Sequence, residues 1–159
     1  GAPGSPARNQ RLLTLRKFVA DGGFVYISDW AFELIAAGFG APLDFHGPDN
    51  NPESTRVALD QTIEGARIVA PHLQQILGSE RIDLTITLPQ MAVVDKALAD
   101  ATVYMSGDVA LPGNLEVQDA PLLASFPVGS GRVVFTSLFR HFAADDVVNK
   151  VITFLIFEL

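Results

Sequence analysis

Apolar residues recur every three or four positions over residues 9–20, and basic residues occupy the other face, which is the pattern of an amphipathic helix. Two glycines follow and end this helix, because glycine adopts the left-handed cap conformation without a steric penalty. The next run, FVYIS at residues 24–28, is almost wholly apolar and favours a central parallel strand covered on both faces. Ser28 and Asp29 both favour helix N-caps, and a second helical pattern begins at Trp30. The opening unit is therefore predicted as helix, strand, helix.

The middle of the chain alternates between turn-like and strand-like segments. Residues 41–53 are rich in Pro, Gly, Asp and Asn, which marks a loop. Residues 91–99 are ambiguous between strand and helix, because they begin with apolar residues that suit a strand and end in helix formers. Strands are predicted at residues 55–63, 81–88 and 101–106, and a short helix is predicted at residues 71–77.

The last part of the chain predicts a hairpin and a helix. Two apolar runs, 122–128 and 132–137, flank the sequence Gly-Ser-Gly at residues 129–131, which favours a late antiparallel hairpin. This glycine sequence lacks the lysine pattern of a phosphate-binding loop, so a turn is the preferred interpretation. Helical spacing of apolar residues predicts a C-terminal helix at residues 144–158.

Composition adds limits to this picture. The 159 residues are 48% hydrophobic, which suits one domain over residues 11–159, and the first ten residues indicate a linker or an expression remnant. The absence of cysteine excludes a disulfide framework, a thiolate metal site and a cysteine nucleophile. A formal net charge of −7 with scattered basic residues makes nucleic acid an unexpected partner. The strongly apolar run 151–157 is far shorter than the roughly 20 residues that span a bilayer, so no membrane anchor is expected. The cellular compartment stays open.

Two segments carry a resemblance to a known family. The sequences LRKFVADGGFVYISDW (residues 15–30) and PLLASFPVGSGRVVFTS (residues 121–137) resemble the class I glutamine amidotransferase-like superfamily, and within it the non-catalytic, uncharacterised bacterial domains and the ThuA-like group. The resemblance leaves residues 54–110 unexplained. It implies a flavodoxin-like, three-layer α/β sandwich whose parallel sheet continues into late antiparallel strands.

The sequence departs from that family in two ways. Members usually begin with a strand-helix-strand unit before the helix that ends in two glycines, whereas ten linker-like residues precede that helix here, so we expect either a fragment of a longer protein or a unit that another polypeptide supplies. In catalytic members, the strand after this helix leads to a nucleophilic cysteine, and the matching positions here are Ser28 and Asp29. Without cysteine, glutaminase chemistry through a thiolate is excluded.

Ser28, Asp29 and Trp30 form the first candidate contact region, because open α/β sheets bind ligands at the carboxyl ends of parallel strands. The alternative interpretation is that Ser28 or Asp29 caps the following helix and that Trp30 is a packing residue. Both interpretations can hold together.

Ser137, Arg140 and His141 follow the predicted hairpin and form the second candidate region. A hydrolytic triad would need a serine, His141 and an acid such as Asp29 or Asp145 within hydrogen-bond reach, but the sequence has no G-x-S-x-G elbow. A surface or interface role for His141 is the alternative.

Other polar clusters have simpler explanations. Asp44, His46 and Asp49 would suit a metal, but a loop rich in Pro and Gly favours solvated turn chemistry, so no metal or cofactor is expected. His72 is expected to be exposed or capped. Four acidic residues are expected to lie on loops and solvate the surface: Asp100, Asp108, Glu116 and Asp119.

The function expected from these patterns is that of a non-catalytic binding or assembly domain of a larger bacterial protein. Its contact surface would include Ser28, Asp29, Trp30 and the region of Arg140 and His141. The alternative is a small-molecule or sugar-processing hydrolase of ThuA-like type that uses His141 and Asp29. The expected partner is a protein or a second copy of the chain, covering an exposed sheet edge or face, and a small-molecule ligand is a further possibility.

Overall fold

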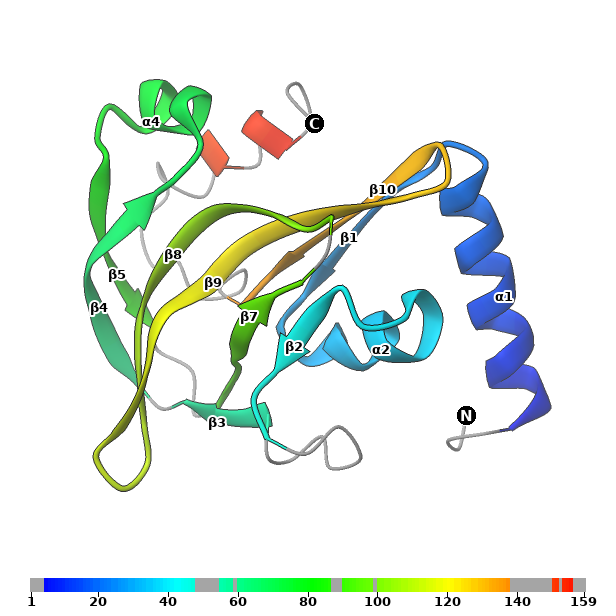
Figure 1. Ribbon diagram of the computed structural model, residues 1–159, viewed down its shortest axis with the longest axis horizontal. Helices are drawn as coiled ribbons and strands as arrows, with labels where there is room; N and C mark the ends of the chain where they lie inside the picture. The colour runs from blue at the N-terminus through cyan, green and yellow to red at the C-terminus, as the bar shows by residue number, and fades with distance from the viewer. Residues whose placement is uncertain are drawn as a thin grey trace.

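The computed structural model describes residues 5–47, 55–58, 60–86, 90–98, 100–137, 150–151 and 153–155. These residues form a mixed α/β fold around a six-stranded, curled sheet, with helices at its ends and on its faces (Figure 1). Among the described residues, no helix has the length and apolar character needed to cross a membrane.

The elements follow one another in this order: α1 (Pro6–Ala20), β1 (Phe24–Ser28), the 3-10 helix η1 (Asp29–Phe32), α2 (Glu33–Phe39), β2 (Leu43–Phe45), β3 (Arg56–Ala58), β4 (Gln61–Ile68), α4 (Pro71–Leu77), β5 (Arg81–Ile86), β6 (Met91–Ala92), β7 (Val94–Ala97), β8 (Thr102–Leu111), β9 (Leu115–Val128) and β10 (Gly131–Thr136). Residues 150–151 and 153–155 are also helical, and the rest of the helix predicted at 144–158 lies outside the described residues.

The main sheet has the strand order β1-β10-β9-β8-β4-β5. β1 pairs with β10 in parallel, and the other four neighbouring pairs are antiparallel. Two small sheets, β2-β7 and β3-β6, complete the fold. The predicted late hairpin is confirmed as β9 and β10, and so is the expected combination of parallel and antiparallel strands in one sheet.

The FVYIS strand is parallel, as predicted, but it lies at one end of the sheet rather than at its centre. Tyr26 packs against the apolar cluster on one face, and Val25 and Ile27 belong to the cluster on the other face. An apolar run therefore indicates that both faces of a strand are covered, but it does not indicate whether both edges of the strand are hydrogen-bonded to neighbouring strands.

Apolar clusters cover both faces of the main sheet. On one face, Met105, Leu123 and Val134 pack with Leu73 of α4 and with Phe154. On the other face, Val133 and Phe135 of β10 pack with residues of α1, η1, α2, β2 and β7. Figure 1 shows α4 and the helical residues near the C-terminus on one side of the sheet, and α2 with β2 on the other.

Helix α1 begins earlier than the pattern predicts and includes residues 6–10, which were expected to form a linker. The Ser5 hydroxyl accepts a hydrogen bond from the Arg8 amide at 3.3 Å, and Pro6 occupies the first turn. A serine N-cap followed by proline is a favourable helix start, so the same small residues that indicated a linker begin the helix.

Two further segments differ from their predictions, and the segment that was ambiguous between strand and helix forms strands. The strand expected at 55–63 is divided into β3, which pairs with β6, and β4, which pairs with β5 and β8. The expected loop 41–53 contains β2, and the ambiguous segment 91–99 contains β6 and β7. These strands are short and obtain their hydrogen bonds from distant partners, which local periodicity does not report.

The turn between β9 and β10 contacts the end of α1 through backbone atoms. The Ser130 amide donates to the Ala20 carbonyl at 2.9 Å, and the Arg132 amide donates to the Gly23 carbonyl at 3.1 Å. A Cβ at Gly129 would lie 2.6 Å from the Ala20 oxygen, and a Cβ at Gly131 would overlap the carbonyl oxygens of Val19 and Gly23. The glycines predicted as a turn are therefore required for this close approach.

We expect Gly131→Ala to lower the free energy of unfolding by about 3 kcal/mol, because the methyl group has no space between two backbone segments. The matched control is Gly113→Ala at the β8–β9 turn, where φ is +81° and no heavy atom lies within 4 Å of the added carbon. That change should cost about 1 kcal/mol through backbone strain alone. Urea unfolding followed by circular dichroism measures both values, and equal losses would contradict the packing explanation.

Candidate functional site

The structure brings together part of the predicted site at the carboxyl ends of β1 and β10. Ser28 is the register partner of Thr136, so Ser28 and Ser137 lie at the same end of the only parallel strand pair among the described strands. Ser137 is fully buried, and its hydroxyl has no hydrogen-bond partner within the described part of the chain. The parallel pair therefore places two serines where an α/β sheet offers a ligand site.

The other predicted residues in these regions have different environments. Trp30 is 52% exposed, and its indole N–H donates to the Gln90 carbonyl at 3.3 Å. Asp29 begins η1, which the Ser28 side chain does not cap with a hydrogen bond. Arg140 and His141, with the acid Asp145, lie outside the described residues, as does the Asp29 side chain, so the proposed pairing of His141 with Asp29 stays a prediction.

The loop histidine expected beside Asp44 and Asp49 has a different acidic partner. The His46 Nδ1 atom lies 2.8 Å from the Asp95 Oδ1 atom, and the two side chains are 30% and 37% exposed. Asp49 lies outside the described residues. In the part of the chain that the structure describes, no group of three His, Cys, Asp or Glu side chains is placed to hold a metal ion. His72 is exposed on α4, as predicted.

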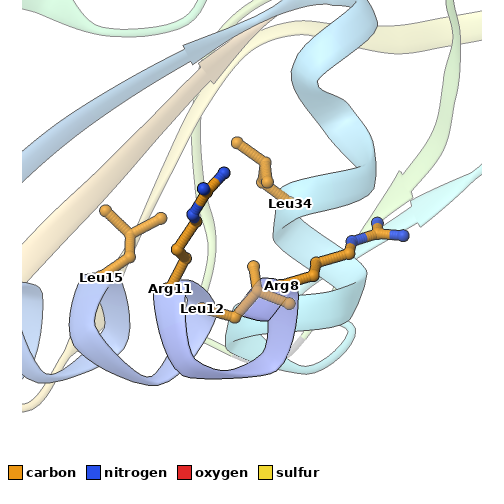
Figure 2. A pocket seen from close by; sticks show the side chains of 5 residues that line it. All are labelled: Arg8, Arg11, Leu12, Leu15 and Leu34. Atoms are coloured by element: carbon orange, nitrogen blue, oxygen red, sulfur yellow. The ribbon is translucent and has the colours of Figure 1, made fainter. Parts of the chain in front are cut away.

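Sequence reasoning missed a hollow between α1 and α2. Arg8, Arg11, Leu12 and Leu15 of α1 and Leu34 of α2 line a shallow hollow of about 240 Å³ (Figure 2). Figure 2 shows the Arg11 side chain extending between Leu15 and Leu34, whereas Arg8 points away toward the other side of α2.

A second hollow lies on the other side of Leu12. It measures about 230 Å³ and is lined by residues of both helices: Asn9, Leu12, Leu13, Arg16, Ala37 and Gly38. A Cβ at Gly38 would lie 3.6 Å from Leu12 Cδ2, so Leu12 packs where α2 has no side chain. The two hollows therefore flank one point of contact between the helices.

Most of the apolar surface of α1 is not buried. Only Val19 is fully buried, whereas Leu13 is 62% exposed and Phe18 is 55% exposed. The helical spacing of apolar residues predicted a packed face, and that expectation is only partly met, because Leu12 and Leu15 are half-buried. We define the α1 face as these exposed and half-buried residues and their basic neighbours: Arg8, Arg11, Leu12, Leu13, Leu15, Arg16 and Phe18.

The α1 face is basic although the chain is acidic. α1 holds four of the 11 basic residues, Arg8, Arg11, Arg16 and Lys17, and no acidic residue. Arg8 approaches Glu33 at 3.7 Å, and Lys17 pairs with Asp21 at 2.6 Å. Arg11 and Arg16 form no ion pair with any carboxylate of the described residues. The signal in the sequence was the set of basic residues on the face opposite the apolar positions of residues 9–20.

A polar cleft lies across β4, β7, β8 and β9. Its two hollows, of about 160 and 350 Å³, share Arg67, Ser106 and Asp119. The Arg67 guanidinium donates to both Asp119 oxygens, at 2.9 and 2.7 Å, and the Ser106 hydroxyl donates to Asp119 at 2.6 Å. The expectation that Asp108, Glu116 and Asp119 lie on loops is wrong, because they lie on β8 and β9.

Asp119 occupies a bulge of β9, with φ of +52° and its amide bonded to Asp108 at 2.8 Å. The hydrogen bond from Ser106, followed by that from Arg67, lowers the pKa of the Asp119 carboxyl below its ordinary value. These partners stabilise the charged form of Asp119. The hydrogen bonds in the cleft therefore hold the β9 bulge at Asp119 in place.

The chain was compared with known proteins. No family model and no curated protein matches it. Its fold is similar to that of a cytoplasmic protein from Salmonella typhimurium, with a TM-score of 0.56 and 18% identity over 92% of this chain and 59% of that protein. A second cytoplasmic protein from Salmonella typhimurium has a TM-score of 0.52 and 19% identity, over 93% of this chain and 55% of that protein.

A GH42 beta-galactosidase from G. stearothermophilus, solved as a catalytic mutant, aligns with a TM-score of 0.47 and 12% identity over 94% of this chain and 19% of that enzyme. The chain thus spans between half and two thirds of the length of the two Salmonella proteins. The likeness to the two Salmonella proteins, at 18% and 19% identity, shows a shared fold.

We expect Asp119→Asn to reduce the loss of stability at acidic pH. A carboxyl with a lowered pKa in the folded state contributes stability above its unfolded pKa of about 4, and this contribution is lost as the pH falls through the folded value. Asparagine keeps the tolerance for positive φ and cannot titrate. The measurement is the free energy of unfolding in urea as the pH falls below 4. If the free energy of unfolding falls with pH in the same way for the variant and the wild type, Asp119 does not contribute to the loss of stability in acid. The loss at neutral pH should be small, since the Asp119 side chain is 62% exposed.

Proposed function

We propose that this chain is a non-catalytic binding or assembly domain and that the α1 face is its main contact surface. One observation carries the proposal: α1 combines large exposed apolar side chains, two shallow hollows and arginines that lack carboxylate partners among the described residues. Isolated exposed leucines are common, but two large exposed apolar side chains on one helix that is flanked by two hollows favour a protein contact.

The energetics of the α1 face support a partner. Covering Leu13 and Phe18 would remove apolar surface from water, which stabilises a complex by about 25 cal/mol per Å². Arginine is enriched at such contacts because its planar group pairs with carboxylates and packs on apolar groups. The preferred partner surface is therefore acidic at its rim and apolar at its centre.

The end of β1 is a second proposed contact region. Trp30 is large and half exposed, and it follows Ser28 at the end of the parallel strand pair. Tryptophan is one of the residues most often found at the energetic centre of protein interfaces. We propose that Ser28, Asp29 and Trp30, with Arg140 and His141, contact a partner or a small ligand.

We also propose a relationship to the class I amidotransferase-like superfamily and its flavodoxin-like architecture. The helix, glycine pair and strand at residues 15–30 and the hairpin at residues 121–137 support it, because they meet in the fold as β1 beside β10. The position of the catalytic cysteine is held by Ser28 and Asp29. Hydrolysis of an ester, amide or sugar that Ser28→Ala or His141→Ala abolishes would contradict the non-catalytic function.

Site-directed cross-linking tests the contact surface directly. Because the chain has no cysteine, Leu13→Cys creates a single site for a thiol-reactive photo-cross-linker. Val69→Cys is the matched control, since Val69 is an exposed apolar residue (38%) away from α1. We expect a protein adduct, in purified protein or in a lysate of source cells, to form severalfold more strongly from residue 13 than from residue 69.

The adduct has to depend on the α1 face. Adding Leu12→Asp, which puts a charge between the two hollows, should abolish the adduct while the far-ultraviolet circular dichroism stays unchanged. Equal adduct yields from residues 13 and 69, or an adduct that survives Leu12→Asp, would contradict the proposal. Mass spectrometry of the cross-linked peptides identifies the partner and its contacting segment.

A further inference from the structure

The β8–β9 hairpin ends in an apolar and acidic tip. Leu111 and Leu115 are the last register pair, and the turn between them uses positive φ angles of +81° at Gly113 and +59° at Asn114. Leu115 is 64% exposed, the highest value among the large hydrophobic residues that the structure describes. Glu116 follows it directly and is also exposed.

The hairpin is held in place near its tip. The Gln61 side chain accepts from the Ala110 amide at 2.9 Å and donates to the Ala110 carbonyl at 3.1 Å. This pair of hydrogen bonds ties β8 to β4, two residues before the turn begins. A segment that is already ordered loses less conformational entropy when it binds, so this tie lowers the entropic cost of binding through the tip.

The tip and the α1 face have opposite charge. Residues 108–119 carry Asp108, Glu116 and Asp119 and no basic residue, whereas α1 carries four basic residues and no acidic one. Asp119 is paired with Arg67, and Asp108 accepts from the Asp119 amide. Glu116 has no ion-pair partner in the described parts of the chain, and neither has Arg11.

We propose, building on the binding function above, that the α1 face receives the β8–β9 tip of a second copy of this chain. Leu115 packs against Leu12, Leu15 and Leu34, and Glu116 pairs with Arg11, whose side chain extends between Leu15 and Leu34. An apolar side chain next to a carboxylate thus matches an apolar hollow next to a guanidinium. The roughly 240 Å³ of the hollow exceeds what one leucine side chain fills.

The placement of the two surfaces determines the type of assembly. Figure 1 shows α1 at one end of the molecule and the β8–β9 tip at the opposite end. Contacts between two α1 faces would bring together like charges, and so would contacts between two tips. The contact is therefore heterologous, head to tail, and each added copy leaves one α1 face and one tip free until a ring closes.

Charge reversal tests the contact. We expect Arg11→Glu and Glu116→Arg each to weaken self-association about tenfold, the effect of losing one charge pair at an interface. The double variant should return to within about threefold of the wild type, because the pair is restored with its charges exchanged. A mixture of the two single variants should associate more tightly than either variant alone. Sedimentation velocity over about a hundredfold range of concentration measures these values.

The control is Glu80→Arg, which makes the same charge change at an exposed position far from both surfaces in sequence and should leave association unchanged. A wild-type chain that stays monomeric throughout, or single variants that associate as the wild type does, would overturn the proposal. An adduct from Leu13→Cys to a different protein would then leave the binding function standing, whereas the absence of any adduct would remove both.

Discussion

The backbone contact between the β9–β10 turn and the end of α1 determines how the rest of the molecule is arranged. Hydrogen bonds to the carbonyls of Ala20 and Gly23 attach α1 to the sheet at its C-terminal end, and Gly129 and Gly131 provide the space. Val19, the one fully buried residue of α1, lies beside this attachment. Toward its N-terminus the helix contacts α2, where Arg8 approaches Glu33 and Leu12 lies beside Gly38, and the two hollows flank this contact.

The curl of the main sheet has a similarly local cause. Gly65 in β4 and Asp119 in β9 both adopt positive φ at places where the strand register shifts. Polar groups stabilise each position: Gly65 bonds to Asp83 and Arg81, and Asp119 bonds to Arg67 and Ser106. β-bulges bend strands and increase their twist. The two bulges therefore account for a local bend in β4 and in β9.

The sequence predicted local secondary structure better than it predicted which strands pair with each other. Two glycines after an amphipathic run defined the end of α1, and Gly129 with Gly131 indicated the hairpin, because these residues act through their own backbone. Three features depend on distant partners and escaped local reasoning: the edge position of β1, the strand β2 within residues 41–53, and the placement of Asp119 on β9. The same distinction applies to the candidate sites. The apolar run predicted that Ser28 lies at the end of a strand, whereas the exposure of Leu13 and Phe18 depends on how little of α1 the sheet covers, which the local sequence does not show.

The parallel pair of β1 and β10 affects how the chain reaches this structure. Its register joins Phe24 to Arg132, so it closes a loop of roughly a hundred residues, whereas β8, β9 and β10 are joined by short turns. Contacts distant in sequence form slowly, because the chain loses loop entropy before it gains the contact. We therefore expect β8, β9 and β10 to form first and α1 with β1 to add last. If so, α1 and β1 are also the segment that we expect to open first in local unfolding.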